Sequence, residues 1–222
     1  LLQKEICLED FEVLKVIGKG AFGKVVLAQK KDNLTYYAIK MLKKKQIVDS
    51  NMVEKTLAEK TILQKMQHPF LVGLEYAFQT DTKLYFVLEF MPGGELFTHL
   101  RREGRFNEAR AKFYAVCIIL GLGFLHDNSY VYRDLKMENV LLDKAGYAVI
   151  TDFGFAKLLR QNEQTKTFCG TPDYVAPEIL NNSGHDRMAD WWSLGILIYE
   201  MIYGQTTFYS DNLQIMYSSI KT

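Results

Sequence analysis

The sequence predicts an α+β fold of two lobes, a small strand-rich lobe over residues 1–90 and a larger helical lobe over residues 91–222. The first observation is a change near residue 90, where runs rich in β-branched and aromatic residues give way to apolar residues at helical spacing. The second is the turn Met91-Pro92-Gly93-Gly94, which breaks regular structure at that change. The third is size, because 222 residues with 48% hydrophobic content can bury a sizeable core.

Five runs in the first lobe are typical of strands, because each carries β-branched or aromatic residues and turn signals such as Asp32-Asn33 separate them. One helix interrupts these strands. Its apolar residues Val53, Leu57 and Leu63 recur at roughly helical spacing, and His68-Pro69 ends it. The predicted strands are residues 11–18, 23–30, 35–42, 71–78 and 83–89, and the predicted helix is 51–66.

The second lobe is predicted to be mainly helical, because apolar residues follow helical spacing over its longer segments. Two short β-branched runs near its middle indicate strands. The predicted helices are residues 95–102, 108–127, 187–203 and 212–220, and the predicted strands are 140–143 and 147–151.

The composition excludes several classes of protein. A formal net charge of +1 gives no basic face for nucleic acid, and the run Lys43-Lys44-Lys45 is typical of a solvated surface. Three widely spaced cysteines fit neither a zinc site nor a disulfide framework and suit a reducing compartment. The longest apolar run, residues 115–125, is too short to span a bilayer. We expect a cytoplasmic, monomeric chain with no transmembrane segment, and recruitment to the nucleus or a membrane by regions outside these residues stays open.

A glycine-rich segment near the start is the first chemical signal. Gly18, Gly20 and Gly23 form a GxGxxG pattern, and glycines let the backbone approach phosphates closely. A dinucleotide-binding turn has the same spacing but leads into a helix. Here the next residues, Lys24–Ala28, are typical of a strand. The pattern favours a strand–turn–strand flap over a nucleotide, with an ordinary hairpin as the alternative.

Lys40 lies late in the third predicted strand, and Glu59 lies in the helix that follows it. A carboxylate at this position could reach the lysine across the lobe. Such an ion pair would hold the ammonium group against the α- and β-phosphates of a nucleotide. The alternative is a solvated lysine at the end of a strand.

Three further motifs follow in order: Tyr132–Asn139 with the letters YRDLKMEN, then Asp152-Phe153-Gly154, then Ala176-Pro177-Glu178. With them the sequence resembles a eukaryotic protein kinase over nearly its whole length. Tyr132, the segment TFCGTP at residues 167–172 and Asp190-Trp191-Trp192 resemble the AGC group. The chain is similar to the protein kinase A, protein kinase B, S6 kinase and protein kinase C branches. The resemblance implies the bilobal kinase fold and the transfer of phosphate from ATP with Mg²⁺.

The resemblance also implies roles for single residues in the transfer of phosphate. Asp134 would accept or orient the proton of the substrate hydroxyl, and Lys136 would steady the γ-phosphate. Thr171 would contact Asp134 and favour serine or threonine acceptors. Asn139 and Asp152 would supply the oxygen ligands that Mg²⁺ prefers.

The nucleotide residues are carried over in the same way, and core packing is the alternative for the apolar ones. The three glycines would cover the phosphates, and the backbone at Glu89 and Met91 would pair with the adenine edge. Leu88 matches the gatekeeper position. The residues expected to enclose adenine are Val25, Ala38 and Leu141.

Phosphorylation of Thr167 by an upstream kinase is the regulation that the resemblance implies. Arg133, beside the catalytic aspartate, is a plausible partner for the phosphate. A plain loop threonine is the alternative, and Thr165 is a nearby competitor. Four apolar residues, Leu63, Leu74, Tyr132 and Phe153, match the stacked spine of active kinases.

Protein substrates with arginine before the acceptor are expected from three glutamates. Glu95, Glu138 and Glu200 match positions that bind such arginines in AGC kinases, and carboxylates select guanidinium groups by paired hydrogen bonds. A solvated surface is the alternative for each of them taken singly.

Two departures from the family pattern stand out. Gln205-Thr206-Thr207-Phe208 replaces the usual proline-containing segment after the long central helix. The family's last helices, the arginine that pairs with Glu178 and the C-terminal tail lie outside the 222 residues, so we expect a lobe truncated at its C-terminus. A catalytically silent binding or scaffolding module is therefore the alternative to an active kinase, although Lys40, Asp134 and Asp152 are all present.

Overall fold

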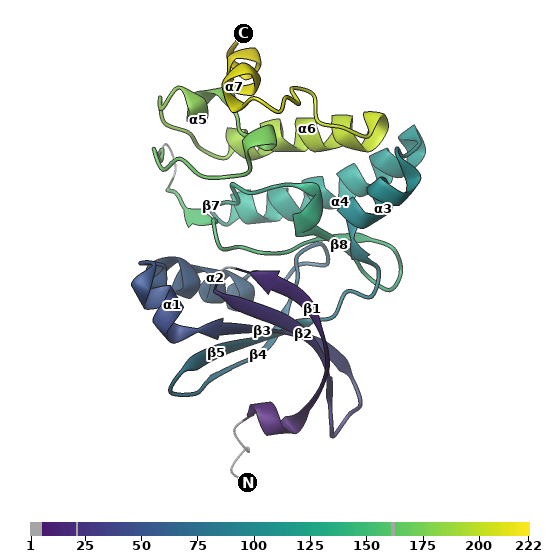
Figure 1. Cartoon of the computed structure of the whole chain (residues 1–222), viewed down its shortest axis with the longest axis vertical. Helices are drawn as coiled ribbons and strands as arrows, with labels where there is room; N and C mark the ends of the chain where they lie inside the picture. The colour runs from purple at the N-terminus through teal and green to yellow at the C-terminus, as the bar shows by residue number, and fades with distance from the viewer. Residues whose placement is uncertain (1–5, 21, 161–162) are drawn as a thin grey trace. The chain divides into compact units, whose positions relative to one another are not determined.

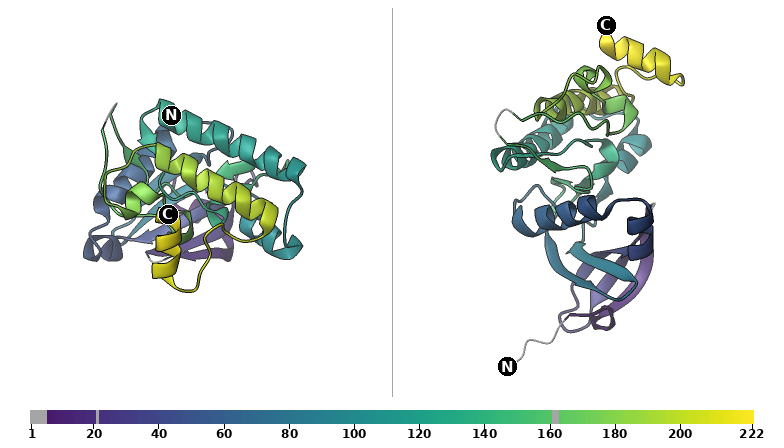
Figure 2. Two further views of the ribbon diagram at one scale, coloured as in Figure 1. Left: turned by 90° about the horizontal axis from the view of Figure 1, so that it is seen from above. Right: turned by 90° about the vertical axis from the view of Figure 1, so that its left-hand side faces the viewer.

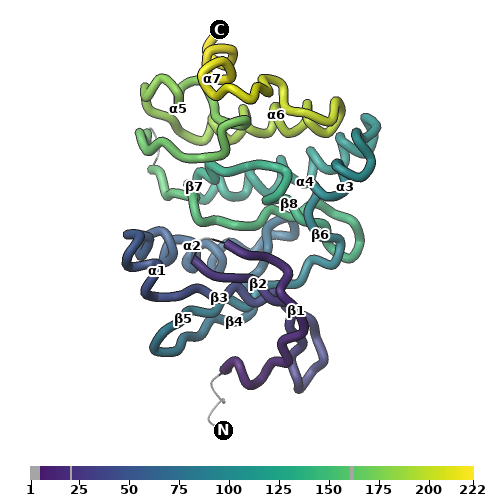
Figure 3. Tube along the Cα trace, viewed as in Figure 1, coloured from purple at the N-terminus to yellow at the C-terminus, as the bar shows by residue number. Residues whose placement is uncertain are grey.

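The computed structural model describes residues 6–20, 22–160 and 163–222, and these form two compact units. The first unit comprises the described residues up to Gln67 together with Val72–Met91. The second comprises His68–Leu71 and Pro92–Thr222. The course of the chain through each unit can be followed along the trace in Figure 3.

The first unit is built on an antiparallel sheet of five strands in the order β1-β2-β3-β5-β4 (Figure 1). Its core face is formed by alternate residues such as Val26, Ile39 and Val87, which are completely buried. Phe11 closes one side of this core with an edge-to-face contact to Tyr37 at 6.0 Å. The strands are β1 (Phe11–Gly20), β2 (Gly23–Lys30), β3 (Tyr36–Lys43), β4 (Leu74–Gln79) and β5 (Lys83–Glu89).

Two helices and a short 3-10 turn, η1 (Leu8–Asp10), complete the first unit. The predicted helix is α2 (Val53–Lys65), whose Ile62 and Leu63 are buried. A second helix, α1 (Lys44–Asp49), was not predicted, and it begins within the lysine run. Lys43 and Lys45 are exposed as expected, but the buried Ile47 holds the segment against the unit.

The strand predicted over residues 71–78 is wrong at its start, because β4 begins at Leu74. Residues 68–71 belong to the second unit. There the Phe70 carbonyl accepts a hydrogen bond from the Ile150 amide at 2.9 Å, and Leu71 bridges to Ile150. The apolar run therefore serves two different sheets, which a periodicity argument does not separate.

The second unit is mainly helical, with small two- and three-stranded sheets (Figure 1). Asn107 caps α4 by accepting a hydrogen bond from the Arg110 amide at 2.9 Å, and Gly204 ends α6 in the left-handed conformation. The helices are α3 (Leu96–Glu103), α4 (Glu108–Asp127), α5 (Pro177–Leu180), α6 (Met188–Tyr203) and α7 (Leu213–Lys221), with 3-10 turns η2 (Met137–Asn139) and η3 (Pro172–Tyr174). The strands are β6 (Gly94–Glu95), β7 (Tyr130–Val131), β8 (Val140–Leu142), β9 (Ala148–Ile150) and β10 (Lys157–Leu158).

Helix α4 packs against α6 and β9 in the second unit, and Figure 2 shows α4 running beside α6. The helix is 20 residues long, whereas the sequence analysis considered only the apolar run 115–125 as a possible membrane span. By length and composition alone, α4 could cross a bilayer. Half of its most apolar window is buried inside the structure. A buried core helix passes the same test, and this packing is typical of one.

Two glycines of α4 provide a matched test of its packing. A Cβ at Gly121 would lie 3.0 Å from the Phe70 carbonyl oxygen and 3.1 Å from Ile150, whereas a Cβ at Gly123 would meet no atom within 4 Å. We expect Gly121→Leu to lower the free energy of unfolding by about 1–3 kcal/mol through overpacking. Gly123→Leu should raise it by about 0.5–1 kcal/mol through helix propensity.

Urea unfolding midpoints of the two variants and the parent protein measure both effects. Equal midpoints for the two variants would contradict this account of how α4 is packed.

Candidate active site

In the first unit, Lys40 and Glu59 form the predicted ion pair. Lys40 lies on β3 and Glu59 on α2, and the Lys40 Nζ to Glu59 Oε1 distance is 2.5 Å. Glu59 is 5% exposed, so its charge is largely removed from water. A buried carboxylate with a close cation is stable only as a pair, and the contact therefore ties α2 to the sheet.

The three glycines occupy different positions in the β1–β2 hairpin. Gly18 pairs with Val25 and Gly20 with Gly23, while residue 21 lies outside the described residues. A Cβ at Gly23 would lie 1.8 Å from the Met41 carbonyl oxygen, so this position requires glycine because β3 is so close. A Cβ at Gly20 would meet nothing within 4 Å, so no packing within the hairpin requires glycine there.

The apolar residues expected to enclose a nucleotide do not lie on the buried face of the sheet. Val25 pairs with Lys40 and Ala38 with Leu88, and both Val25 and Ala38 are only half-buried, unlike their neighbours Val26 and Ile39. Core packing in the first unit therefore does not account for Val25 and Ala38. In the same unit Glu89 is exposed at the end of β5, and Leu88 and Met91 are buried. Leu141, on β8 of the second unit, is half-buried.

In the second unit, a hydrogen-bonded cluster surrounds Asp134. Thr171 Oγ1 donates to Asp134 Oδ1 at 3.0 Å, and Lys136 Nζ lies 3.0 Å from Thr171 Oγ1 and 3.2 Å from Asp134 Oδ2. Asn139 Nδ2 donates to both the main-chain oxygen and Oδ2 of Asp134, each at 2.9 Å. The structure thus brings together four residues separated by up to 37 positions.

The loop that carries Asp134 is held by the buried carboxylate of Asp190, at the start of α6. Asp190 accepts hydrogen bonds from the amides of Tyr132 at 2.8 Å and Arg133 at 2.7 Å. His126 Nε2 donates to the same carboxylate at 2.7 Å. These bonds hold Arg133 at a φ of 69°, in the left-handed region that costs energy for a side chain.

The sequence analysis did not assign this supporting role to Asp190 or His126. In the sequence analysis Asp190 served only as part of a motif typical of the AGC group, and His126 was not considered. The sequence carries little signal for this role, because an aspartate in the first turn of a helix is common, and the burial of Asp190 is known only from the structure.

Asn139 and Asp152 are oxygen-bearing residues held next to this cluster. The Asn139 carbonyl accepts from the amide of Thr151 at 2.9 Å, which fixes the residue just before Asp152. With its Nδ2 bonded to Asp134, the Oδ1 of Asn139 points elsewhere and can serve as a ligand. The pKa of the Tyr132 phenol is raised by burial first and then by the nearby charges of Asp152 and Asp134.

These residues fit Mg²⁺ with phosphate oxygens completing its shell, since that ion usually takes only one or two protein ligands. Within the described ranges no group of three or more His, Cys, Asp or Glu side chains could hold a metal without such help. Tyr132 and Phe153, two of the predicted spine residues, meet edge-to-face at 5.8 Å, and both are fully buried. Leu63 and Leu74 lie in the other unit.

Thr167 and Thr165 lie side by side. Lys157 Nζ donates to Thr165 Oγ1 at 3.0 Å, and the hydroxyl of Thr167 lies 3.4 Å from that of Thr165. Thr165 is buried, at 3% exposed, whereas Thr167 is exposed. Of the two hydroxyl groups, that of Thr167 is the one open to a modifying enzyme.

Two of the three predicted substrate glutamates lie near each other. Burial, with the charges of Glu138 and Asp173, raises the pKa of Glu200 to about 7, against the hydrogen bond that Tyr174 donates to it. Thr206, from the segment that departs from the family pattern, donates to Asp173 at 3.1 Å. Glu95 lies on β6 at the N-cap of α3 and is exposed.

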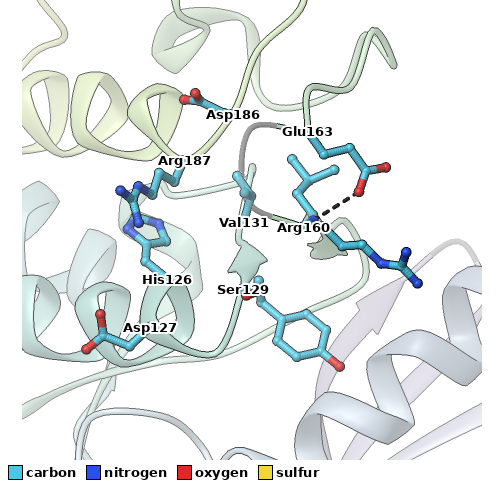
Figure 4. Close-up of a pocket in the computed structure, with 10 residues that line it drawn as sticks. His126, Asp127, Ser129, Val131, Arg160, Glu163, Asp186 and Arg187 are labelled. Carbon is cyan, nitrogen blue, oxygen red and sulfur yellow. Dashed lines mark hydrogen bonds between the residues drawn. The ribbon is translucent and has the colours of Figure 1, made fainter.

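A separate cavity of about 410 Å³ opens in the second unit beside β7 (Figure 4). Figure 4 shows Arg187 beside His126, and Glu163 accepting a hydrogen bond from the Arg160 amide at 2.9 Å. The side chains that line this cavity include both acidic and basic groups, and none of the predicted site residues is among them. The lining residues are His126, Asp127, Ser129, Tyr130, Val131, Leu159, Arg160, Glu163, Asp186 and Arg187.

Comparison with known proteins accounts for most of the chain. Residues 11–222 match the family model described as protein kinase domain. "Protein kinase 2" of Dictyostelium discoideum is 55% identical over 96% of this chain and 44% of its own length. The RAC family serine/threonine-protein kinase homolog of the same organism is 50% identical over 98% of this chain and 49% of its own length. Human serine/threonine-protein kinase Sgk1 is 53% identical over 95% of this chain and 49% of its own length. The chain therefore spans about half the length of these relatives.

The raised pKa of Glu200 predicts a dependence of stability on pH. The folded protein holds this proton up to about pH 7, whereas an unfolded glutamate releases it near its model value of 4.5, so stability falls as pH rises between these values. We expect the free energy of unfolding of Glu200→Gln not to fall over this pH range. At the upper end of the range it should exceed that of the parent protein by up to about 3 kcal/mol.

Chemical denaturation at several pH values measures this gain, with the exposed Glu95→Gln as the matched control. If the free energies of unfolding of Glu200→Gln and the parent protein changed with pH in parallel, burial would not perturb the pKa of this carboxyl group.

Proposed function

Because the chain belongs to the protein kinase family and to its AGC group, we propose that it transfers the γ-phosphate of Mg·ATP to serine or threonine residues of proteins. The hydrogen-bonded cluster of Asp134, Lys136, Asn139 and Thr171 is the observation that carries this proposal. Phosphoryl transfer needs positioned groups and neutralised charge more than covalent chemistry, and this cluster supplies both.

The chemistry of the cluster follows from its donors and acceptors. Asp134 is acceptor-only when ionised, and its two oxygens are held by Thr171 and Asn139, so the carboxylate is oriented before a substrate arrives. It can therefore orient a substrate hydroxyl and take its proton as the oxygen–phosphorus bond forms. Lys136, 3.2 Å from Asp134, can follow the negative charge as it moves to the transferred group.

Mg²⁺ would supply neutralisation of phosphate charge, and Asn139 and Asp152 would hold it. In the first unit, the Lys40–Glu59 pair would present an ammonium group to phosphates, with Gly18, Gly20 and Gly23 on the hairpin. The other residues proposed to contact ATP are Val25, Ala38, Leu88, Glu89 and Met91 of the first unit and Leu141 of the second.

We propose arginine-containing protein substrates on the basis of Glu138 and Glu200. Burial and, to a smaller extent, the charge of Glu138 raise the pKa of Glu200, and a guanidinium group beside both carboxylates would offset this with charge-assisted hydrogen bonds. Glu95 is proposed to contact a second arginine. A cytoplasmic location and a monomeric state also remain proposals, and the described cysteines, which no disulfide joins, suit the first.

Transfer of labelled phosphate from Mg·ATP to an arginine-rich serine peptide tests the activity. We expect Asp134→Asn to lower kcat by about 10²–10⁴-fold, the contribution of a positioned acid–base group, while leaving nucleotide binding in place. A tyrosine peptide of the same sequence and a peptide with arginine replaced by alanine are the matched substrate controls.

Nucleotide binding without any transfer by the parent protein would favour the scaffolding alternative. Transfer that is indifferent to arginine would disprove the roles of Glu138 and Glu200.

We further propose that phosphorylation of Thr167 by another kinase activates the protein. The exposed hydroxyl of Thr167 next to the Lys157–Thr165 contact supports this, because a phosphate there would gain a cation at once. We expect Thr167→Ala protein to show no rise in kcat after treatment with an activating kinase, whereas Thr165→Ala protein should still respond. The reverse result would assign the site to Thr165.

A further inference from the structure

Three buried polar atoms of the second unit lack a hydrogen-bond partner among the described residues: Nη1 of Arg133, Nε2 of His185 and Nε1 of Trp192. The first two belong to side chains that can carry a positive charge and bind an anion. Arg133 is 9% exposed and His185 is 3% exposed, so water does not readily satisfy either atom. A buried polar atom without a partner costs free energy, and such an atom in a native fold calls for an explanation, of which a bound ion is one.

The backbone holds His185 beside the segment that carries the two threonines. The Thr165 amide donates to the His185 carbonyl and the His185 amide donates to the Thr165 carbonyl, each at 2.9 Å. The Thr165 hydroxyl in turn joins Lys157 and Thr167. His185, Lys157 and the Thr167 hydroxyl are therefore gathered around one residue.

Charged groups of both signs act on His185. Burial lowers its pKa first, the positive charges of Arg133 and Lys157 lower it further, and the carboxylates of Asp190 and Asp186 raise it. The Asp190 carboxylate also accepts hydrogen bonds from the amides of the catalytic loop. The guanidinium of Arg133 is anchored through Nε, which donates to the Phe155 carbonyl at 2.8 Å, and this leaves Nη1 for a ligand.

We propose that His185 is a positioning residue that, with Arg133 and Lys157, binds the phosphate carried by Thr167. The inference rests on the proposed function, in which the γ-phosphoryl group of ATP is transferred to Thr167 Oγ1 by another kinase, with loss of the hydroxyl proton and departure of ADP. A phosphate dianion offers three acceptor oxygens to these three donors. Thr167 rather than Thr165 is the carrier, because Thr165 is buried and its hydroxyl is already hydrogen-bonded.

This arrangement couples the phosphate to a proton. A dianion beside His185 raises the imidazole pKa and lowers that of the phosphate, so the pair takes up a proton where the unphosphorylated protein keeps neutral histidine. The histidine contribution to the stability of the phosphorylated state is present below its raised pKa and is lost as pH rises through it.

Phosphorus NMR of the whole protein with phosphothreonine incorporated at position 167 during synthesis tests the proposal without an upstream kinase. We expect the phosphate of the parent protein to titrate below the pKa of about 6 of a free phosphate monoester, with a second inflection from His185. His185→Phe should move the titration toward that of the free ester and remove the second inflection. His185→Gln should remove the inflection but restore part of the downward shift, because an amide still donates a hydrogen bond.

His99→Gln is the matched control, since His99 lies on α3 and bonds to the Gly93 carbonyl, and its titration should equal that of the parent. Titrations that superimpose for the parent, His185→Phe and His185→Gln proteins would overturn the proposal, as would a free-ester titration in the parent. His185→Gln is the decisive variant if His185→Phe does not fold.

Kinase activity of the same samples separates this proposal from the proposed function. A His185-dependent titration in a protein whose kcat the phosphate does not raise would support the binding site and reject activation. A phosphate that raises kcat equally in the parent and His185 variants, with unchanged titrations, would support activation and reject the role of His185.

Discussion

The hydrogen bonds to the Asp190 carboxylate are the interaction on which the arrangement of the site in the second unit depends. A buried charge is tolerated only when several donors surround it, and Asp190 receives two amides of the catalytic loop and the ring of His126. Because both of its oxygens accept hydrogen bonds from the loop, they stabilise the conformation of the loop, including the positive φ of Arg133. Asp134 is therefore placed by α6, an element more than 50 residues away in the chain.

Asp134 is hydrogen-bonded to two further segments, and it fixes the position of each. Toward Asn139 and Thr151 it sets the position of Asp152. Toward Thr171 it sets the start of η3, whose last residue, Tyr174, donates a hydrogen bond to Glu200. Asn139 for the metal, Lys136 for the γ-phosphate and Glu200 for one substrate arginine are thus linked through hydrogen bonds within the second unit. Such a network holds its groups in place before ligands arrive.

Much of the fold was predicted from patterns within single segments. The strands of the first unit and the helices α2, α3, α4, α6 and α7 lie within a few residues of their predicted bounds, because each carries its own apolar period and turn residues. Helix α1, the two-residue strands β6, β7 and β10, and the true start of β4 were missed. These short elements have too few residues for a period, and contacts with distant segments, such as that of Leu71 with Ile150, form them.

The sequence by itself determined the family, the residue types of the site and their order, since motifs such as YRDLKMEN and DFG state which donors and acceptors are present. Only the tertiary structure decided how they are used. Gly23 is required by the nearness of β3, and Val25 and Ala38 lie off the core face. Burial, with the charge of Glu138, raises the pKa of Glu200, and His185 lies buried near Arg133. The physical reason is that burial and charge act through space, between residues whose separation in the chain carries no record of their distance.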